Sequence, residues 1–543
     1  MTRPDTANQP PPLVDYNLFD SDAPLRESFE REGASWAEDI VEELGALAGT
    51  QHSIELGFQA NANPPQLRTH DRFGNRIDEV EFHPAWHELM EVAVSHGLHA
   101  LPWREPRPGA HAARAAAFYI WSQVEGGHGC PISMTYAAVP TLRKQPDLAR
   151  AWEPLIESLD YDFGLKEPRS KKGVLFGMAL TERQGGSDVR ANTTRAVPTG
   201  NGGEYLLTGQ KWFCSAPMCD AFLVLAQAPG GLSCFLLPRV LPDGGRNNFR
   251  IERLKDKLGN RSNASAEIAL EEAWAVMVGE EGRGVRTIIE MVNHTRLDCI
   301  IGSASLMRQA VAQATHHAAH RSAFGKQLAH QPLMANVLAD LAIESEAATI
   351  LMMRLAGSFD RAASDEAAAH FKRIGTAVGK FWTCKRAVSV AAEALECLGG
   401  NGYVEESIMP RLYREAPLNS IWEGSGNVNA LDVLRAIARE PESLPAFFAE
   451  VESAKGMDAR LDSAVGSLRR ELSDPADAES RARTIVSAMA VALQASLMLR
   501  HGDPMSAELF CGSRLGSERG AVYGTLKPRR EFESVIERHR PRL

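Results

Sequence analysis

The sequence lacks the cysteine spacing of a zinc-binding or disulfide-rich protein. Its eight cysteines are scattered over 543 residues, and no two of them form a C-x-x-C pair. Structural zinc sites and small secreted folds depend on closely spaced, paired cysteines. We therefore predict neither a zinc site nor a disulfide framework, and we expect the protein to occupy a reducing compartment.

The sequence also lacks a long, uninterrupted apolar segment. Its opening, MTRPDTANQPPP, is polar and Pro-rich, and the most apolar later run, residues 484–499, is interrupted by Gln494 and by serines. A membrane-spanning helix needs about 20 predominantly apolar residues, and a secretory signal needs an apolar core. We predict a buried helix at 484–499, no membrane partner and a cytoplasmic location.

Positive charge is not in excess. The 59 Lys and Arg residues are outnumbered by 69 Asp and Glu residues, which gives a net charge of −10. This balance excludes a uniformly basic nucleic-acid binder but permits a local basic face. With 44% hydrophobic residues, the chain is long enough to bury several cores.

The texture of the sequence changes along the chain. Residues with helical spacing give way after about 176 to short β-rich runs such as AFLVLAQA, and long helical patterns return after about 285. We predict a mainly α protein with a central β domain. The predicted parts are a disordered tail (1–12), an N-terminal helical domain (13–176), a middle β domain (177–284), a helical bundle (285–440) and a C-terminal helical domain (441–543).

One carboxylate, in the segment NSIWEGSGNVNALDVLR (419–435), stands out. Glu423 follows Trp422 and precedes Gly424, which permits a tight backbone bend. Desolvation beside Trp422 would raise the pKa of Glu423, as a general base requires. Alternatively, Glu423 is an ordinary carboxylate that favours the N-terminus of the following helix.

A second segment, ALTERQGGSDVRANTT (179–194), follows an apolar strand. Gly185 and Gly186 let the backbone approach a planar or phosphorylated ligand closely, and Thr181 and Ser187 offer hydroxyl groups. Taken alone, such a Gly-Gly-Ser-Asp run is also an ordinary turn.

Over its whole length, this second segment resembles the first signature of the acyl-CoA dehydrogenase flavoprotein family. The pattern from Glu396 through Gly399-Gly400-Asn401-Gly402-Tyr403 to Glu415 resembles the second signature. The resemblance departs from the commoner pattern at Glu396, where many members have Gln, and at Cys214, an unusual neighbour for the flavin.

The resemblance implies an N-terminal helical domain, a β-barrel-like middle domain and a C-terminal helical bundle that together bind FAD. It implies that Glu423 removes the α-proton of an acyl thioester while the β-hydrogen leaves as hydride to flavin N5. Arg321 and Phe324 would hold the pyrophosphate and adenine of a neighbouring subunit's FAD. The implied cofactor-binding residues are Met178, Leu180, Thr181, Gly185, Gly186, Ser187, Phe213, Ser215, Arg321, Phe324, Gly399, Gly400, Trp422, Gly424, Ser425 and Asn427.

A closer resemblance, to the AidB-like alkylation-response subgroup, covers nearly the whole chain. It rests on segments such as ANANPPQL, EFHPAWHELM and PRLYREAPLNSIWEGSGN and on the helical segment beyond 440. It implies a homotetramer, weak isovaleryl-CoA dehydrogenase-like activity, and binding of double-stranded DNA through the added C-terminal domain.

The end of the chain is locally basic, which suits phosphate. A charge run is usually a solvated face, and no helix-turn-helix or zinc finger is evident, so we expect contacts to the DNA backbone without base readout. The predicted DNA-binding residues are Arg435, Arg514, Arg519, Lys527, Arg529 and Arg530.

Three functional hypotheses follow. We favour an FAD-containing, DNA-binding protein of the alkylation response with residual dehydrogenase activity; the alternative is a metabolic acyl-CoA dehydrogenase without a DNA role. A structural tetramer with a vestigial site is disfavoured because Glu423 and both signatures are retained. No metal is predicted, because no carboxylate or thiol stands at a matching offset from His316, His317 and His320.

Overall fold

Most of the strands lie in one stretch of the chain, residues 176–278. The computed structural model describes residues 8–516, 520–527 and 531–543. The chain forms two compact units, each assembled from separate stretches. The first unit comprises Met1–Ile54, Arg107–Val124 and Arg296–Leu543, and the second comprises Glu55–Pro106 and Glu125–Thr295.

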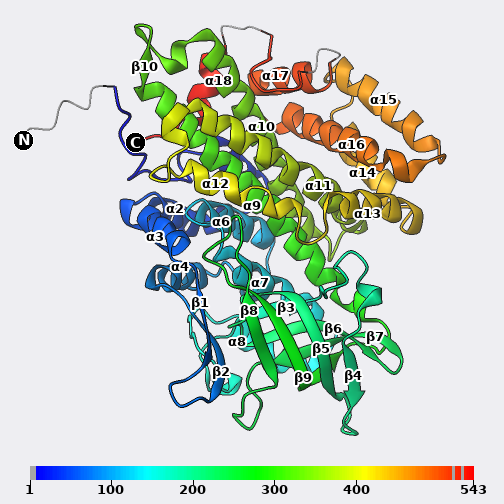
Figure 1. Cartoon of the computed structure of the whole chain (residues 1–543). Helices are drawn as coiled ribbons and strands as arrows, with labels where there is room; N and C mark the ends of the chain where they lie inside the picture. Colours follow the sequence, from blue (N-terminus) through cyan, green and yellow to red (C-terminus); the bar gives the residue numbers. More distant parts are fainter. Residues whose placement is uncertain (1–7, 517–519, 528–530) are drawn as a thin grey trace, which may run out of the picture. The chain divides into compact units, whose positions relative to one another are not determined.

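The second unit is built around one seven-stranded sheet (Figure 1). β6 pairs in parallel with β3 and antiparallel with β7, while β9 pairs antiparallel with β5, β7 and β8. The pairings from β6 through β4, β5, β9 and β7 return to β6, so the sheet closes as a barrel does. Its strands are β3 (Phe176–Ala179), β4 (Arg195–Pro198), β5 (Glu204–Ser215), β6 (Ala221–Ala228), β7 (Gly231–Pro238), β8 (Phe249–Leu254) and β9 (Ser265–Val278).

The second unit also holds a hairpin that the sequence analysis did not predict. β1 (Gln66–His70) and β2 (Arg76–Glu81) pair antiparallel within the segment expected to be helical. The carboxylate of Asp71 accepts hydrogen bonds from the backbone N–H groups of Phe73 and Asn75, which forms the turn between the strands. The helices of this unit are α4 (Pro84–Ser95), α5 (Leu101–Arg104), α7 (Gly129–Leu142) and α8 (Pro146–Ile156), and α3 (Gln51–Ala62) begins in the first unit.

The first unit is a helical bundle. Its long helices carry continuous apolar faces, and α10 packs on α11, α6 and α1. A buried ion pair joins Arg114 of α6 to Asp298 of α9. The helices of the bundle are α1 (Ala23–Arg31), α2 (Glu38–Ala48), α6 (Ala110–Ser122), α9 (Gly284–His320, which begins in the second unit), α10 (Pro332–Arg361), α11 (Glu366–Cys397), α12 (Met409–Glu415) and α13 (Gly426–Arg439).

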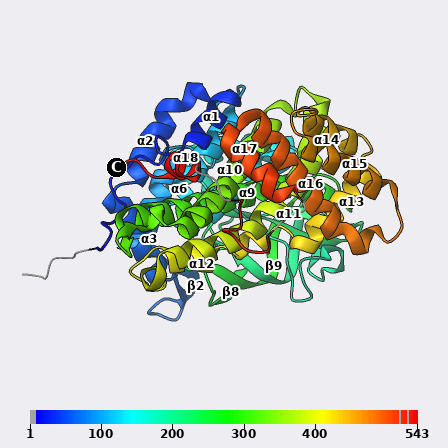
Figure 2. The same ribbon diagram turned by 90° about the horizontal axis from the view of Figure 1, so that it is seen from above.

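The helices beyond residue 440 belong to the same compact unit as the bundle (Figure 2). α16 packs on α10, α11 and α13, and α18 packs on α10. α16 is the one helix, among the described residues, that is long and apolar enough to span a membrane, and most of its apolar window is buried inside the protein. These helices are α14 (Ser443–Glu452), α15 (Ala459–Ser473), α16 (Ala478–His501), α17 (Pro504–Arg514) and α18 (Phe532–His539).

The predicted fold class, mainly α with a central β domain, is confirmed. Of the predicted boundaries, 176 and 284 lie at the starts of β3 and α9, and 440 lies between the helices α13 and α14, whereas the compact units combine distant stretches of the chain. Of the tail predicted at 1–12, residues 1–7 lie outside the described residues. Asn8 and Pro11 are attached to the bundle through Arg321 and His316.

Candidate active site

In the second unit, the first signature segment is anchored by a buried carboxylate. Glu182 accepts hydrogen bonds from the backbone N–H of Thr193 (2.6 Å), the hydroxyl of Thr194 (2.5 Å) and the ammonium of Lys211 (2.8 Å). Although burial would raise it, these donors, Lys211 first, lower the pKa of Glu182 to about 2. The loop between β3 and β4 is therefore fixed by a charged group that is itself buried.

The two glycines of this loop have different surroundings. Gly185 has φ +124°, and a Cβ on it would meet open space. A Cβ on Gly186 would stand 2.5 Å from Thr181 Oγ1. The backbone at Gly185 is therefore accessible to a ligand, while Gly186 lets Thr181 pack closely against the loop.

The end of β5 presents a half-exposed aromatic ring. Phe213 is 50% exposed, and Lys255 Nζ lies 4.7 Å from its ring centroid. The hydroxyl of Ser215 lies 3.3 Å from that of Ser265. Cys214, which stood out in the sequence, is fully buried, and burial raises the pKa of its thiol to about 12. Its side chain therefore lies in the core, away from the exposed ring of Phe213.

In the first unit, Glu423 sits in a constrained bend at the start of α13. Its φ is +56° and that of Gly424 is +97°, both in the left-handed region. Both Glu423 and Trp422 are half-buried, and the indole N–H of Trp422 donates to Asn419 Oδ1 (2.9 Å). The carbonyl of Glu423 accepts from Arg296 Nε (3.1 Å), so the backbone carrying the carboxylate is tied to α9.

The residues just after Glu423 form the N-terminus of α13. Ser425 occupies the N-cap position, and its side chain makes no capping hydrogen bond. Asn427 Oδ1 accepts from Arg483 Nη1 (2.9 Å), which extends from α16. The sequence analysis missed Arg483, since 56 residues separate it from Asn427 and no local pattern marks it.

Arg321 and Phe324 lie at a small hairpin made of β10 (Ser322–Ala323) and β11 (Lys326–Gln327). Phe324 is 97% exposed with φ +52°, and Arg321 Nη1 donates to the carbonyl of Asn8 (2.8 Å). Gly399, with φ +59°, has open space where a Cβ would stand, as does Gly400. Both glycines therefore leave their backbone open to a ligand.

Comparison with known proteins decides the family. Residues 8–163 match the adaptive response protein AidB N-terminal domain, residues 177–273 the acyl-CoA dehydrogenase middle domain, and residues 282–438 the acyl-CoA dehydrogenase C-terminal domain. The chain is 47% identical over 518 residues to AidB of Escherichia coli (strain K12), covering 94% of each chain. It belongs to the AidB-like acyl-CoA dehydrogenases.

A sequence match and a structure match from a nematode agree with this assignment. Acyl-CoA dehydrogenase family member 11 of Caenorhabditis elegans is 32% identical over 422 residues, which cover 75% of this chain and 68% of that protein. The crystal structure of Caenorhabditis elegans ACDH-11 in complex with C11-CoA matches this fold with a TM-score of 0.87 at 27% identity, covering 98% of this chain and 95% of the other. The predicted family is thus confirmed.

Acyl-CoA dehydrogenases depend on FAD, and residues of this AidB-like chain fit that cofactor. In the second unit, the open backbone at Gly185 and the half-exposed ring of Phe213 suit a planar, phosphorylated ligand. In the first unit, the open glycines 399 and 400 and the exposed Phe324 have the same character. These residues are therefore compatible with FAD, the cofactor of the family.

Arg514, one of the predicted DNA-binding residues, is held in ion pairs inside the protein. Its guanidinium is largely buried and pairs with Asp340 (2.6 Å) and Glu344 (2.9 Å) of α10. Although burial alone would lower its pKa, these two carboxylates raise it. The sequence analysis counted this positive charge without seeing that it is neutralised inside the protein.

The structure describes two of the other five predicted DNA-binding residues. Arg435 is half-exposed and pairs with Asp432 (3.0 Å), and Lys527 is exposed. Arg519, Arg529 and Arg530 lie outside the described residues. Arg435 and Lys527 therefore lie at the surface of the part of the chain that the structure describes.

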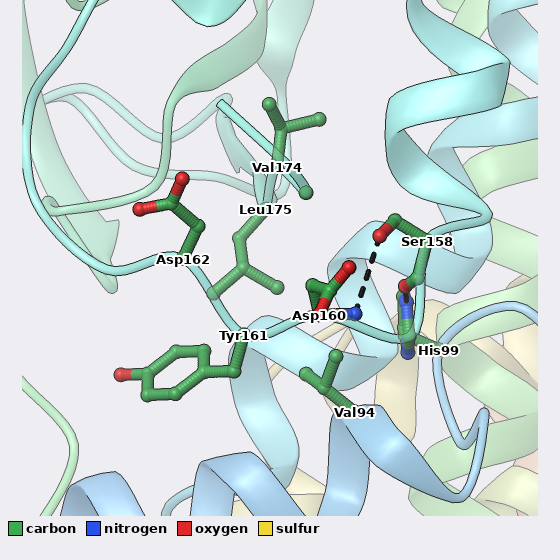
Figure 3. Close-up of a pocket in the computed structure, with 9 residues that line it drawn as sticks. Val94, His99, Ser158, Asp160, Tyr161, Asp162, Val174 and Leu175 are labelled. Atoms are coloured by element: carbon green, nitrogen blue, oxygen red, sulfur yellow. Dashed lines mark hydrogen bonds between the residues drawn. The ribbon is translucent and has the colours of Figure 1, made fainter. Parts of the chain in front are cut away.

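The pocket drawn in Figure 3 is not the candidate active site. It lies in the second unit, where His99 Nε2 donates to the carbonyl of Ser158 (2.9 Å), and no predicted site residue lines it.

In the first unit His316 Nε2 donates to the carbonyl of Pro11 (2.8 Å), and burial lowers the pKa of His317 to about 4. Within residues 8–516, 520–527 and 531–543, no group of side chains is arranged to hold a metal ion.

Proposed function

We propose that this AidB-like acyl-CoA dehydrogenase oxidises acyl-CoA thioesters between the α and β carbons, with Glu423 as the base. The observation that carries the proposal is the backbone of Glu423 at the start of α13. It has a left-handed conformation, and its carbonyl is held by a hydrogen bond from Arg296. A non-glycine residue persists in this conformation only when its surroundings hold it, and such residues cluster at functional sites. The acyl-CoA named with the nematode structure supports this substrate class.

Glu423 would remove the proton from the α-carbon of the thioester, leaving the C–H electron pair to form the new double bond. FAD, when bound, supplies the acceptor for the β-hydrogen, which departs as hydride, so the substrate loses two electrons and two hydrogens. Phe213 and Ser215 would contact the flavin ring, and the open glycines would approach the phosphates and adenine. The other cofactor-binding residues predicted from the sequence would also contact the bound FAD.

Replacing Glu423 with Gln tests this proposal. The amide keeps the shape but cannot take a proton, so anaerobic flavin reduction by isovaleryl-CoA or C11-CoA should slow by about 10²–10⁴-fold. The flavin spectrum should not change. Glu471→Gln on α15 serves as a matched control that should keep the parent's rate. A Glu423→Gln variant as fast as the parent would show that another group is the base.

We further propose that the chain assembles as a homotetramer in the cytoplasm. Large apolar side chains of the first unit are exposed, among them Phe324 (97%), Leu333 (82%) and Tyr403 (80%). Such exposure is typical of surfaces that another chain covers. Arg321 would then reach the FAD of a neighbouring subunit, since its planar guanidinium suits a pyrophosphate. Arg321→Ala should lower both flavin content and tetramer content in gel filtration coupled to light scattering.

A second proposed function is non-specific binding of double-stranded DNA in the response to alkylation. It is supported by the similarity to AidB over 94% of the chain and by the basic terminal sequence, in which Arg519, Arg529 and Arg530 are concentrated. Contacts to phosphate would supply the affinity. A duplex of any sequence, titrated at several salt concentrations, separates this protein from an acyl-CoA dehydrogenase of metabolism, which would not bind it.

A further inference from the structure

Three successive carbonyl oxygens around Glu423 are each held by a cationic side chain. Lys380 Nζ donates to the carbonyl of Trp422 (2.7 Å) and to that of Gly424 (2.5 Å). Arg296 Nε donates to the carbonyl of Glu423 between them (3.1 Å). The lysine comes from α11 and the arginine from α9, so two helices of the bundle grip one short bend.

The side chain of Lys380 is buried, and its ammonium donates hydrogen bonds to uncharged carbonyl groups. The residue is 1% exposed, and its ammonium makes two hydrogen bonds to backbone carbonyls. A buried ammonium is costly unless its hydrogen bonds are made. Here carbonyl dipoles of the Glu423 bend meet that need, so the position of the bend and the burial of Lys380 depend on each other.

Arg296 differs from Lys380 because it belongs to an ion-pair network. Arg296 Nη1 contacts Asp432 (2.7 Å), and Asp432 also pairs with Arg373 (3.1 Å). Removing Arg296 would leave a buried carboxylate short of a partner and would disturb α13 as a whole. Lys380 is therefore the residue through which the bend can be loosened selectively.

We propose that Lys380 is a positioning residue that fixes the direction of the Glu423 carboxylate. By drawing the carbonyls of residues 422 and 424 to one point, it holds Glu423 at φ +56° and Gly424 at φ +97°. A free chain would leave this left-handed conformation at a non-glycine residue. The inference rests on the proposed role of Glu423 as the base.

The test compares Lys380→Met with Lys372→Met, a lysine two turns earlier on the same helix. Methionine keeps much of the volume but removes the donors. With FAD bound, reduction by saturating isovaleryl-CoA should slow by about 10–100-fold in Lys380→Met, because a small misplacement of a reacting group has effects of this size. The KM should change less than about threefold, since substrate binding does not pass through Glu423. Lys372→Met should match the parent.

A second readout does not depend on the reaction. Hydrogen–deuterium exchange of backbone amides at 421–426, followed by mass spectrometry on the apoprotein, should become about tenfold faster in Lys380→Met and stay unchanged in Lys372→Met. Parental exchange together with a parental rate in Lys380→Met would overturn the inference. If Lys380→Met did not fold, Lys380→Gln, whose side-chain NH2 group can still donate, would carry the same two measurements. If neither folded, Lys380 would be a stability element and the positioning role would be wrong.

A double variant separates this inference from the proposed function. If Lys380 acts through Glu423, adding Lys380→Met to Glu423→Gln should slow flavin reduction no further, whereas a general structural role would slow both backgrounds. A slow Glu423→Gln with a parental Lys380→Met would refute the positioning role alone. A parental rate in Glu423→Gln would refute the base itself and this inference with it.

Discussion

The first signature loop and the bend at Glu423 are held by buried charges of opposite sign. In the second unit, the carboxylate of Glu182 gathers N–H, O–H and ammonium donors around the first signature loop. In the first unit, Lys380 and Arg296 gather carbonyl oxygens around Glu423. The carboxylate fixes its loop by accepting hydrogen bonds, and the cations fix their bend by donating hydrogen bonds to its carbonyl oxygens. Each arrangement makes the local backbone more rigid.

The two arrangements differ in how the buried charge is neutralised. Glu182 pairs with Lys211, and both side chains are almost completely buried. Lys380 is met by carbonyl dipoles instead. Removing one partner of a buried ion pair leaves an uncompensated charge, whereas removing Lys380 leaves carbonyls that are neutral. We therefore expect that removing Lys211 from the first signature loop mainly lowers the free energy of unfolding. Removing Lys380 from the Glu423 bend should mainly lower the rate of flavin reduction.

The largest effect on stability is expected from Lys211→Met. This change leaves the carboxylate of Glu182 buried without its ammonium partner and should lower the free energy of unfolding by about 3–5 kcal/mol. Urea denaturation of the full chain measures the change. Lys166→Met is the matched control, because Lys166 is exposed and its pair with Asp162 (2.9 Å) should contribute about 0–1 kcal/mol. Equal losses in the two variants would break the comparison.

A second buried pair extends the comparison to an arginine that was expected to face DNA. Arg514→Met should lower the free energy of unfolding by about 2 kcal/mol, since Asp340 loses a partner while Glu344 keeps Arg386. Arg469→Met, which breaks an exposed pair with Glu452 (2.7 Å), should change it by less than about 1 kcal/mol. Affinity for duplex DNA should not change in Arg514→Met. A selective loss of DNA binding would restore Arg514 to the DNA-binding set.

These residues show what the sequence could and could not predict. Glu423 and the glycines of both signatures could be proposed as site residues because each belongs to a long, continuous sequence motif. Lys380 and Arg483 were not, because their partners lie 42 to 56 residues away and nothing nearby marks either one. The ion pairs of Arg514 could not be predicted either, since counting charges cannot distinguish a solvated guanidinium from one that is neutralised in a core.

The pH dependence of stability offers a smaller effect from the same loop. Because the pKa of Glu182 is lowered to about 2, its ionised form stabilises the folded state fully above the ordinary carboxyl pKa. That contribution is lost as the pH falls from about 4.5 through 2. In Glu182→Gln, the slope of unfolding free energy against pH should flatten there by up to about one proton. Glu271→Gln, which removes an exposed carboxylate, is the control and should keep more of the parent's slope.

The smallest effect is expected at the chain's basic end. Reversing Arg519, Arg529 and Arg530 to Glu should weaken binding of duplex DNA by about tenfold at moderate salt. The slope of log affinity against log salt should flatten by up to about 2.7, since each lost phosphate contact contributes about 0.9. Fluorescence anisotropy with two unrelated duplexes measures both quantities. The change should be the same for the two duplexes, because backbone contacts do not read sequence.

Reversal of Arg68, Arg246 and Arg250 in the second unit makes the same change in net charge and should leave the slope close to the parent's. If this control flattens the slope equally, net charge alone accounts for binding; if the terminal variant keeps the parent's affinity and slope, the DNA surface lies elsewhere.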